Sequence, residues 1–152
     1  MTAYRPDILI QSPQGKPIAV VEVKNRQHFS RDIAREYRRN LLTHGFYPHG
    51  PYFLLTSQDK GYLWTETKEN VIEAEPNYEF PMDNIVARYT KTTPGERLYG
   101  SVFEFVVLQW LSDLSRGASK TLEEPEKTLE LAGFNRSIEG AKVVANVAEE
   151  NE

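Results

Sequence analysis

The feature that most constrains the fold is a pair of short apolar segments near the N-terminus, joined by turn-forming residues. Residues 7–11 (Asp-Ile-Leu-Ile-Gln) and 18–24 (Ile-Ala-Val-Val-Glu-Val-Lys) flank Ser-Pro-Gln-Gly-Lys-Pro at 12–17. A cluster of serine, proline and glycine is typical of a turn. The second segment is β-branched and apolar until its end, which is typical of a central strand. The sequence therefore predicts an N-terminal β-hairpin whose second strand lies inside a sheet.

This hairpin brings two acidic residues together. If residues 13–16 form the loop, the register places Asp7 opposite Glu22. Directly opposed residues in antiparallel strands have Cβ atoms about 4.5–5.5 Å apart, and two carboxylates so close repel each other unless a positive charge lies between them. Mg²⁺ fits such a pair, because it prefers one or two carboxylates together with waters and phosphate oxygens. Lys24 follows Glu22 by two residues and points to the same face. Together these groups have the parts needed to activate water and to stabilise a phosphodiester transition state.

Further elements follow along the N-terminal half of the chain. The pattern predicts a helix from Ser30, as its N-cap, to about Thr43. Strands are expected over residues 52–56 and 62–64. Residues 65–97 hold several acids and prolines with few periodic apolar positions, so they predict irregular connections with one short helix.

The first helix has two distinct faces. Its expected buried stripe has residues spaced four apart, namely Ile33, Tyr37 and Leu41. Another face carries arginines at helical spacing, namely Arg31, Arg35, Arg38 and Arg39. These arginines are either a solvated face partly paired with Asp32 and Glu36 or a contact surface for a nucleic-acid backbone. Arg26, just beyond the hairpin, is a further candidate for phosphate contact.

The most apolar helix is expected in the C-terminal half. Residues 101–114 predict a helix that begins with the capping box Ser101-x-x-Glu104 and is apolar nearly all round. Such a helix lies either deep in the core or at a subunit interface. Together with an unpaired sheet edge, it predicts a homodimer. A helix is also expected over residues 122–132, whereas 138–147 is compatible with either strand or helix.

Composition narrows the class of protein. The 152 residues suit one domain, and the absence of cysteine excludes disulfides, zinc–thiolate sites and cysteine nucleophiles. No basic stretch leads into an apolar run at the N-terminus, and the most apolar segment falls short of a bilayer span, so a soluble, cytoplasmic protein is expected. Residues 1–63 hold nine Lys or Arg against five Asp or Glu, whereas residues 64–152 hold nine against seventeen. The basic half contains the candidate site, which is compatible with a nucleic-acid partner.

The order Arg5-Pro6-Asp7, then a hairpin containing Gly-x-Pro, then Glu22-Val23-Lys24 resembles the PD-(D/E)XK nuclease superfamily, which has the restriction-endonuclease-like fold. It is similar in particular to the nuclease domain of type I restriction subunit R and to small stand-alone bacterial relatives. The resemblance covers residues 5–64 and implies an α/β fold with a mixed β-sheet flanked by helices. It also implies Mg²⁺-dependent cleavage of DNA, with Mn²⁺ able to substitute. In that case Asp7 and Glu22 bind the metal, and Lys24 orients the attacking water.

The sequence departs from the family's pattern in two places. In the family a helix, often donating an acid, and a strand precede the Pro-Asp motif. Only five residues precede Pro6 here, so we expect these elements to be missing or supplied from elsewhere. Many relatives also carry Gln-x-x-x-Tyr on the helix after the Glu-x-Lys strand. Tyr37 is present, but Ile33 occupies the glutamine position.

We therefore expect residues 1–116 to form a restriction-endonuclease-like domain, and residues 117–152 to form a C-terminal extension, partly helical, that packs on it and ends in an acidic tail. The expected function is that of a Mg²⁺-dependent endonuclease acting on DNA. The alternative is a catalytically inactive module on the same scaffold that binds nucleic acid or a protein partner. The expected catalytic residues are Asp7, Glu22 and Lys24, and the expected nucleic-acid contacts are Arg26, Arg31, Arg35 and Arg38.

Overall fold

The computed structural model describes residues 6–44, 50–65, 74–91, 96–117 and 122–145, so the predicted acidic tail lies outside the described residues. Its strands form one six-stranded sheet in the order β5-β4-β3-β2-β1-β6. The strands are β1 (Ile8–Gln11), β2 (Pro17–Val23), β3 (Tyr52–Thr56), β4 (Lys60–Thr65), β5 (Tyr78–Pro81) and β6 (Lys142–Ala145). The β2–β3 pair is parallel and the remaining pairs are antiparallel. The expected mixed sheet of an α/β protein is confirmed.

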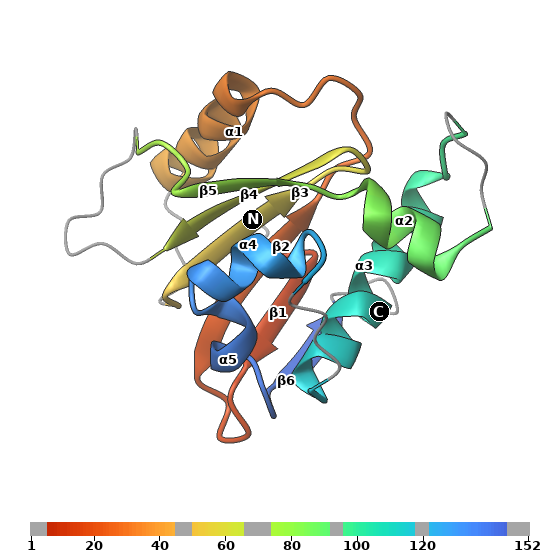
Figure 1. The fold of residues 1–152 in the computed structure, drawn as a ribbon. Helices are drawn as coiled ribbons and strands as arrows, with labels where there is room; N and C mark the ends of the chain where they lie inside the picture. Colours follow the sequence, from red (N-terminus) through yellow and green to blue (C-terminus); the bar gives the residue numbers. More distant parts are fainter. Residues whose placement is uncertain (1–5, 45–49, 66–73, 92–95, 118–121, 146–152) are drawn as a thin grey trace, which may run out of the picture.

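Helices cover both faces of this sheet. They are α1 (Arg31–Thr43), α2 (Asp83–Tyr89), α3 (Gly100–Ser115), α4 (Glu126–Leu131) and α5 (Phe134–Ser137). Because β2 and β3 are parallel neighbours, the chain must cross over between them, and α1 makes this crossover on one face. Figure 1 shows α1 at the top, separated by the sheet from the other helices, which pack on the opposite face.

The alternation of side chains along the strands divides the core into two layers. On the α3 side, the buried strand residues include Ile8, Ile10, Ala19, Val21, Leu54 and Leu63. On the α1 side they are Val20, Phe53, Leu55, Tyr62 and Trp64, with Leu9 packed against them. Successive residues of a strand point to opposite faces. Asp7, Glu22 and Lys24 therefore follow the parity of Leu9 and Val20, on the face that α1 covers.

The predicted hairpin register is confirmed along most of β1. Ile8 pairs with Val21, and this register continues to Ile10 and Ala19. The prediction is wrong at the turn. Gln11 pairs with Pro17 rather than Ile18, because the register shifts after Ile10. The turn itself uses Gly15 with a φ of 90°, a left-handed conformation that favours glycine.

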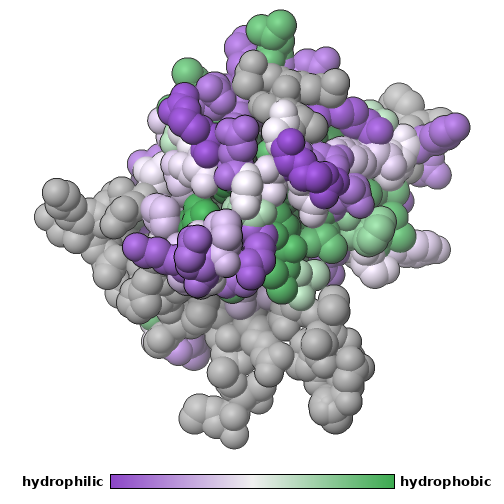
Figure 2. Space-filling model, turned by 90° about the horizontal axis from the view of Figure 1, so that it is seen from below, coloured by the Kyte–Doolittle hydropathy of each residue, from purple (hydrophilic) through white to green (hydrophobic). Residues whose placement is uncertain are grey.

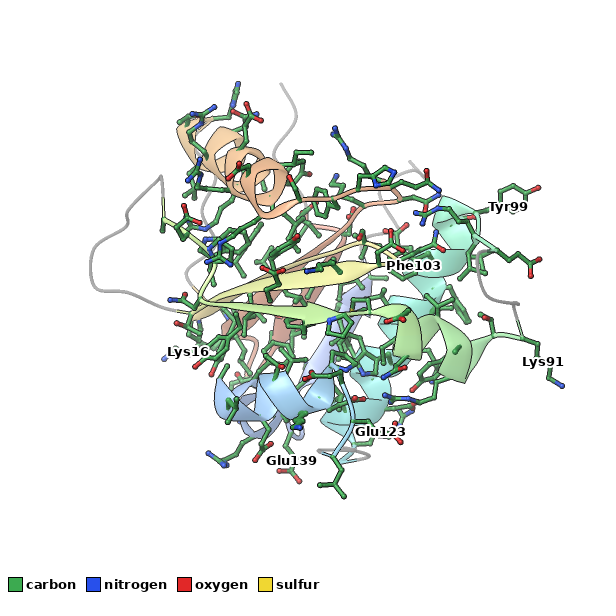
Figure 3. All side chains as sticks on the ribbon, turned by 45° about the horizontal axis from the view of Figure 1, so that its top comes forward. Lys16, Lys91, Tyr99, Phe103, Glu123 and Glu139 are labelled. Atoms are coloured by element: carbon green, nitrogen blue, oxygen red, sulfur yellow. The ribbon has the colours of Figure 1, made fainter. Side chains whose placement is uncertain are left out.

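The apolar helix α3 lies in the core of this chain. Phe103, Val107 and Trp110 are almost completely buried against the sheet. Figure 3 shows Phe103 turned inward, whereas Tyr99, directly before the helix, projects away from it. This core position accounts for most of the helix's apolar character, and the homodimer stays a prediction. In the part of the chain that the structure describes, no helix is long and apolar enough to cross a membrane.

The predicted capping box of α3 is wrong. The helix begins one residue earlier, at Gly100, with Tyr99 as its N-cap and no capping side-chain hydrogen bond. Glu104 therefore does not act as part of a helix cap. It lies instead at the margin of the buried face, where its charge acts on the candidate site described below.

Two other predictions need correction, and one alternative that the sequence left open is decided. Residues 65–97 contain β5 as well as the expected short helix, and this edge strand was missed because only four residues pair. The helix expected over 122–132 is shorter, because the chain before Pro125 follows another path and α4 begins at Glu126. The ambiguous stretch 138–147 contains β6, which pairs with β1 on the sheet edge beside Asp7.

Hydrophobic side chains also reach the surface. The large exposed ones among the described residues are Tyr99, Val102, Phe105, Leu122, Leu131 and Val144. Figure 2 shows the face seen from below, where hydrophobic residues gather among hydrophilic ones. Scattered exposed apolar residues are normal for a folded domain, so these positions alone define no binding surface.

A buried ion pair joins α2 to α4. The carboxylate of Glu126 is fully buried and accepts two hydrogen bonds from Arg88, at 2.7 and 2.9 Å, and one from the Trp110 indole at 3.0 Å. Asn135 donates to the backbone carbonyl of Glu126 at 3.0 Å. The buried charge is therefore compensated on each side, and the pair fixes how the C-terminal helices pack.

Candidate functional site

The three predicted residues converge at one end of the central strands. Asp7 lies directly before β1, and Glu22 and Lys24 lie at the end of β2. Continuation of the β1–β2 register puts Asp7 opposite Glu22, and Asp7 Oδ2 accepts a hydrogen bond from the Val23 amide at 2.8 Å. The Asp7 carboxylate is thus anchored to the strand that carries the other two residues.

Glu22 is the most buried member of the site, with 2% of its surface exposed. Its Oε1 accepts a hydrogen bond from the Tyr37 hydroxyl at 3.2 Å, whereas its buried Oε2 has no hydrogen-bond partner. Burial raises the pKa of Glu22 to about 7, although the Lys24 ammonium, the Tyr37 hydroxyl and the Asp7 amide all favour the ionised form. A nearly neutral pKa means that a small change in local charge decides whether this carboxyl is ionised.

Lys24 and Tyr37 complete the face around Glu22. The Lys24 Nζ atom lies 3.8 Å from Glu22 Oε1 and 4.4 Å from the centroid of the Tyr37 ring. The hydroxyl of Tyr37 donates to Glu22, and burial together with the Glu22 charge raises the pKa of Tyr37. One tyrosine on α1 therefore contacts both charged groups of the β2 motif and limits where they lie. Ile33 packs one turn earlier on the same helix.

A third acid reaches the site from α3. Burial raises the pKa of Glu104, the Asp7 carboxylate raises it further, and the Lys24 ammonium opposes the shift. Glu104 in turn raises the pKa of Glu22. The sequence reasoning missed this residue by assigning it to a helix cap. An acid at the edge of an otherwise apolar helix face was the signal that pointed to another role.

Buried Gln58 holds the loops around Lys24. Its amide nitrogen donates to the Asn25 side chain and to the Leu98 carbonyl, and its amide oxygen accepts from the Leu98 amide at 3.0 Å. The backbone amide of Lys24 donates to the Thr56 carbonyl at 2.8 Å. These bonds tie the residue after Lys24 to the chain that enters α3, and so connect the positions of Lys24 and Glu104.

The four predicted nucleic-acid contacts do not form one open basic face. Arg31 and Arg35 both bind Glu75, at 3.0 and 2.5 Å, and thereby tie α1 to the segment before β5. Arg38 is 5% exposed and lies over the Trp64 ring, so its guanidinium belongs to the contact between α1 and β4. Arg26 is exposed and lines a pocket beside Lys24. Of the four, Arg26 is the one that the structure brings next to the predicted catalytic lysine.

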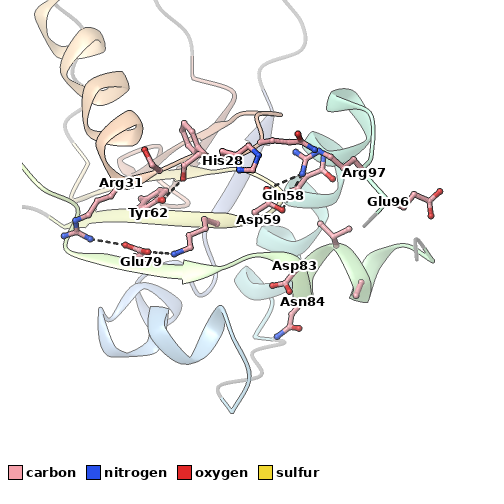
Figure 4. A pocket seen from close by; sticks show the side chains of 16 residues that line it. His28, Arg31, Gln58, Asp59, Tyr62, Glu79, Asp83, Asn84, Glu96 and Arg97 are labelled. Atoms are coloured by element: carbon pink, nitrogen blue, oxygen red, sulfur yellow. Dashed lines mark hydrogen bonds and ion pairs between the residues drawn. The ribbon is translucent and has the colours of Figure 1, made fainter. Parts of the chain in front are cut away.

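Two cavities flank the loop after β2. The larger, of about 1040 Å³, opens over β4, β5 and α2 (Figure 4). Its Lys and Arg side chains are paired with acids, since Arg31 and Lys60 bind Glu79 and Arg97 binds Asp59. The smaller, of about 370 Å³, lies between this loop and α1 and is lined by Lys24 and Tyr37. The smaller cavity therefore adjoins the candidate site.

The fold and the site define a mixed α/β domain with paired acids and a lysine at the end of a central strand. Comparison with models of protein families, with curated proteins and with solved structures found no match. Within the described residues, no group of three or more His, Asp or Glu side chains lies close enough to hold a metal ion. Asp7 and Glu22 are the two acids available there as metal ligands, and Glu104 acts on them through its charge.

The raised pKa of Glu22 makes stability depend on pH. Between about pH 4.5 and 7 the folded chain retains a proton that the unfolded chain has lost, so the free energy of unfolding falls as pH rises through this window. Glu22→Gln stays neutral and avoids this loss. At pH 8 without metal we expect the variant to be more stable than wild type by on the order of 2 kcal/mol.

Urea unfolding in EDTA at pH 4.5 and pH 8 measures this difference. The gain should nearly disappear at pH 4.5, because Glu22 is protonated there in the folded chain and only about half ionised in the unfolded chain. Glu36→Gln, at an exposed carboxylate of α1, is the control and should show no such pH dependence. An equal gain in stability of Glu22→Gln at both pH values would contradict the raised pKa of Glu22 in the folded chain.

Proposed function

We propose that this protein is a Mg²⁺-dependent endonuclease that hydrolyses phosphodiester bonds of DNA on a restriction-endonuclease-like fold. Asp7 and Glu22 would hold the metal ion, and Lys24 would orient the attacking water. The observation that carries the proposal is the buried Oε2 atom of Glu22, which accepts no hydrogen bond. A buried carboxylate oxygen without a partner costs free energy. A cation shared with Asp7 would remove that cost.

The donor atoms fit this ion. Mg²⁺ takes oxygen ligands and is commonly held by one or two carboxylates, with the remaining positions left to water and phosphate. When bound, the ion would supply a Lewis acid that lowers the pKa of water and neutralises charge on the phosphate. Its positive charge would also favour the ionised form of Glu22, whose pKa of about 7 is raised by burial.

The chain's own residues provide the remaining functions. The Lys24 ammonium lies on the same side as Glu22 and can donate hydrogen bonds to a water molecule or a phosphate oxygen there. Tyr37 fixes Glu22 through its hydroxyl and contacts Lys24 through its ring. Glu104 adds negative charge beside Asp7, which increases the attraction of the site for a cation.

The arrangement of elements also supports the assignment to this fold. The Pro-Asp and Glu-x-Lys motifs lie on antiparallel β1 and β2, followed by α1 and parallel β3. On this proposal, elements from the C-terminal half would take the places of the family's preceding strand and acidic helix. β6 pairs with the free edge of β1, and α3 brings Glu104 toward Asp7 and Lys24. This chain would thus build the same site with a different order of elements.

Calorimetric titration of the purified protein with Mg²⁺ and Mn²⁺ tests the metal site. Wild type should bind one ion per chain at pH 8, and Asp7→Asn should weaken binding by 10-fold or more, about 1.4 kcal/mol, because one of two anionic ligands is lost. Asp59→Asn, at an exposed acid outside the site, is the control. Absence of binding, or binding unchanged by Asp7→Asn, would favour a non-catalytic module instead.

A further inference from the structure

The smaller cavity lies directly beside the proposed catalytic lysine. It occupies about 370 Å³ between α1 and the segment that follows β2. Small-molecule pockets in proteins span roughly 300–1,000 Å³, so this space suits a group the size of one nucleoside. It is lined by Lys24, Arg26, Phe29, Ile33, Tyr37 and Asn40, together with Asn25 and the acid Glu36.

The lining combines apolar and charged groups in the way that a nucleotide requires. Phe29, Ile33 and the Tyr37 ring form apolar walls, and aromatic rings are the surfaces on which nucleobases stack. Lys24 and Arg26 supply two positive charges against the one negative charge of Glu36, so the lining is positive on balance and attracts phosphate. The exposed side-chain amide of Asn40 has donors and an acceptor suited to a base edge.

The apolar wall is rigidly held. Phe29 is 4% exposed and packs edge-on against Tyr62, with ring centroids 6.0 Å apart. The Tyr62 hydroxyl donates to the Phe29 carbonyl at 2.6 Å. The cavity is therefore formed before any ligand binds, and a ligand would not need to order this wall.

We propose that this pocket receives one unpaired nucleotide next to the scissile phosphate, so that the substrate is single-stranded or locally unpaired DNA. This inference rests on the proposed nuclease function. In an intact duplex the bases are stacked inside the helix, and turning one into a pocket costs a few kcal/mol, roughly, whereas a single strand avoids most of that cost. The larger cavity is a poorer site for this strand, because its lining has four acids, Asp59, Glu79, Asp83 and Glu96, against three Lys or Arg residues.

Two matched variants test the pocket. Asn40→Glu puts a negative charge at the lining of the pocket, and Thr43→Glu puts the same charge one helical turn away, outside the lining. Both positions are exposed on α1, so both variants should fold, which circular dichroism verifies. Binding of a fluorescent 12-nucleotide single strand and of the corresponding 12-base-pair duplex is measured by anisotropy in EDTA. Cleavage of the same DNAs is measured in Mg²⁺.

We expect wild type to bind the single strand at least about 10-fold more tightly than the duplex. Stacking of one base on an aromatic side chain contributes about 1–3 kcal/mol, and about 1.4 kcal/mol corresponds to a 10-fold difference in affinity. Asn40→Glu should remove this preference by weakening single-strand binding about 10-fold, whereas Thr43→Glu should change it less than about 2-fold. In Mg²⁺, wild type should cut the single strand faster than the duplex.

The two levels of the proposal fail in different ways. Equal affinity for both DNAs, or equal effects of Asn40→Glu and Thr43→Glu, would overturn the pocket assignment even if wild type cuts DNA. A retained single-strand preference that depends on Asn40, in a protein that cuts neither DNA, would overturn the nuclease and support the pocket as a binding site for unpaired nucleotides.

Discussion

Replacing Lys24 by alanine is expected to lower the rate of DNA cleavage by about 100- to 1,000-fold, the usual effect of removing one preorganised hydrogen-bond donor from the charge that develops in a transition state. The Lys24 ammonium is the cation that the fold holds 3.8 Å from Glu22, and its removal takes away a donor for water or phosphate. Its loss also removes an interaction that favours ionised Glu22, so metal affinity should decrease as well. Initial cleavage rates at saturating Mg²⁺ measure the effect on chemistry apart from the effect on metal binding.

The matched control for this variant is Lys16→Ala. Lys16 is exposed in the turn of the same hairpin, and its replacement removes the same charge from the same strand pair. It should leave the rate within about 2-fold of wild type, because exposed charges that contact no substrate contribute little. Lys24→Ala should also unfold at nearly the wild-type temperature. Cleavage that survives in Lys24→Ala would show that the activity belongs to another site or to a contaminant.

Glu126→Ala is expected to destabilise the fold by about 3–5 kcal/mol, the usual cost of removing one partner from a buried ion pair. The substitution leaves the Arg88 guanidinium, which is 22% exposed, without its two hydrogen bonds to carboxylate oxygens. It also leaves the buried indole N–H of Trp110 without an acceptor and removes packed volume. The contact between α2 and α4 depends on the Glu126 carboxylate, so the substitution should lower the stability of the whole domain.

Thermal and urea unfolding measure this loss. For a domain of this size, 3–5 kcal/mol corresponds to a fall in Tm of roughly 10 °C. Glu123→Ala is the control, because Glu123 is 59% exposed and its carboxylate lies 3.7 Å from the same arginine. That variant should lose less than about 1 kcal/mol, as exposed ion pairs do. Equal losses in the two variants would contradict the buried network.

The local parts of the fold were predictable from the sequence because local rules govern them. The hairpin from Ile8 to Val21, the α1 helix with Ser30 as its N-cap, and β3 all follow from turn residues, side-chain alternation and capping. The pairing of β6 with β1 was beyond such rules, since it joins residues more than 130 positions apart. The short strand β5 was also missed, because four residues are too few for a clear alternation of apolar and polar side chains. It is a strand because it pairs with β4.

In the candidate site too, residues placed by local structure were predictable, whereas those placed by long-range packing were not. Asp7, Glu22 and Lys24 were predictable because one hairpin carries all three. Glu104 was not, since its place beside Asp7 depends on how α3 packs against the sheet. Arg38 was expected on an open face because its helical spacing groups it with Arg31, Arg35 and Arg39. The Trp64 ring gives its guanidinium a buried position that helical spacing alone does not reveal.

The central proposal is that Asp7 and Glu22 jointly hold a metal ion for DNA hydrolysis. The most direct test incubates purified wild type and Asp7→Asn with labelled single-stranded, duplex and branched DNA, in Mg²⁺ and in EDTA. We predict cleavage by wild type in Mg²⁺, none in EDTA, and none by Asp7→Asn. Failure of wild type to cut any of these DNAs in Mg²⁺ or Mn²⁺, or cutting that persists in EDTA, would contradict the proposal.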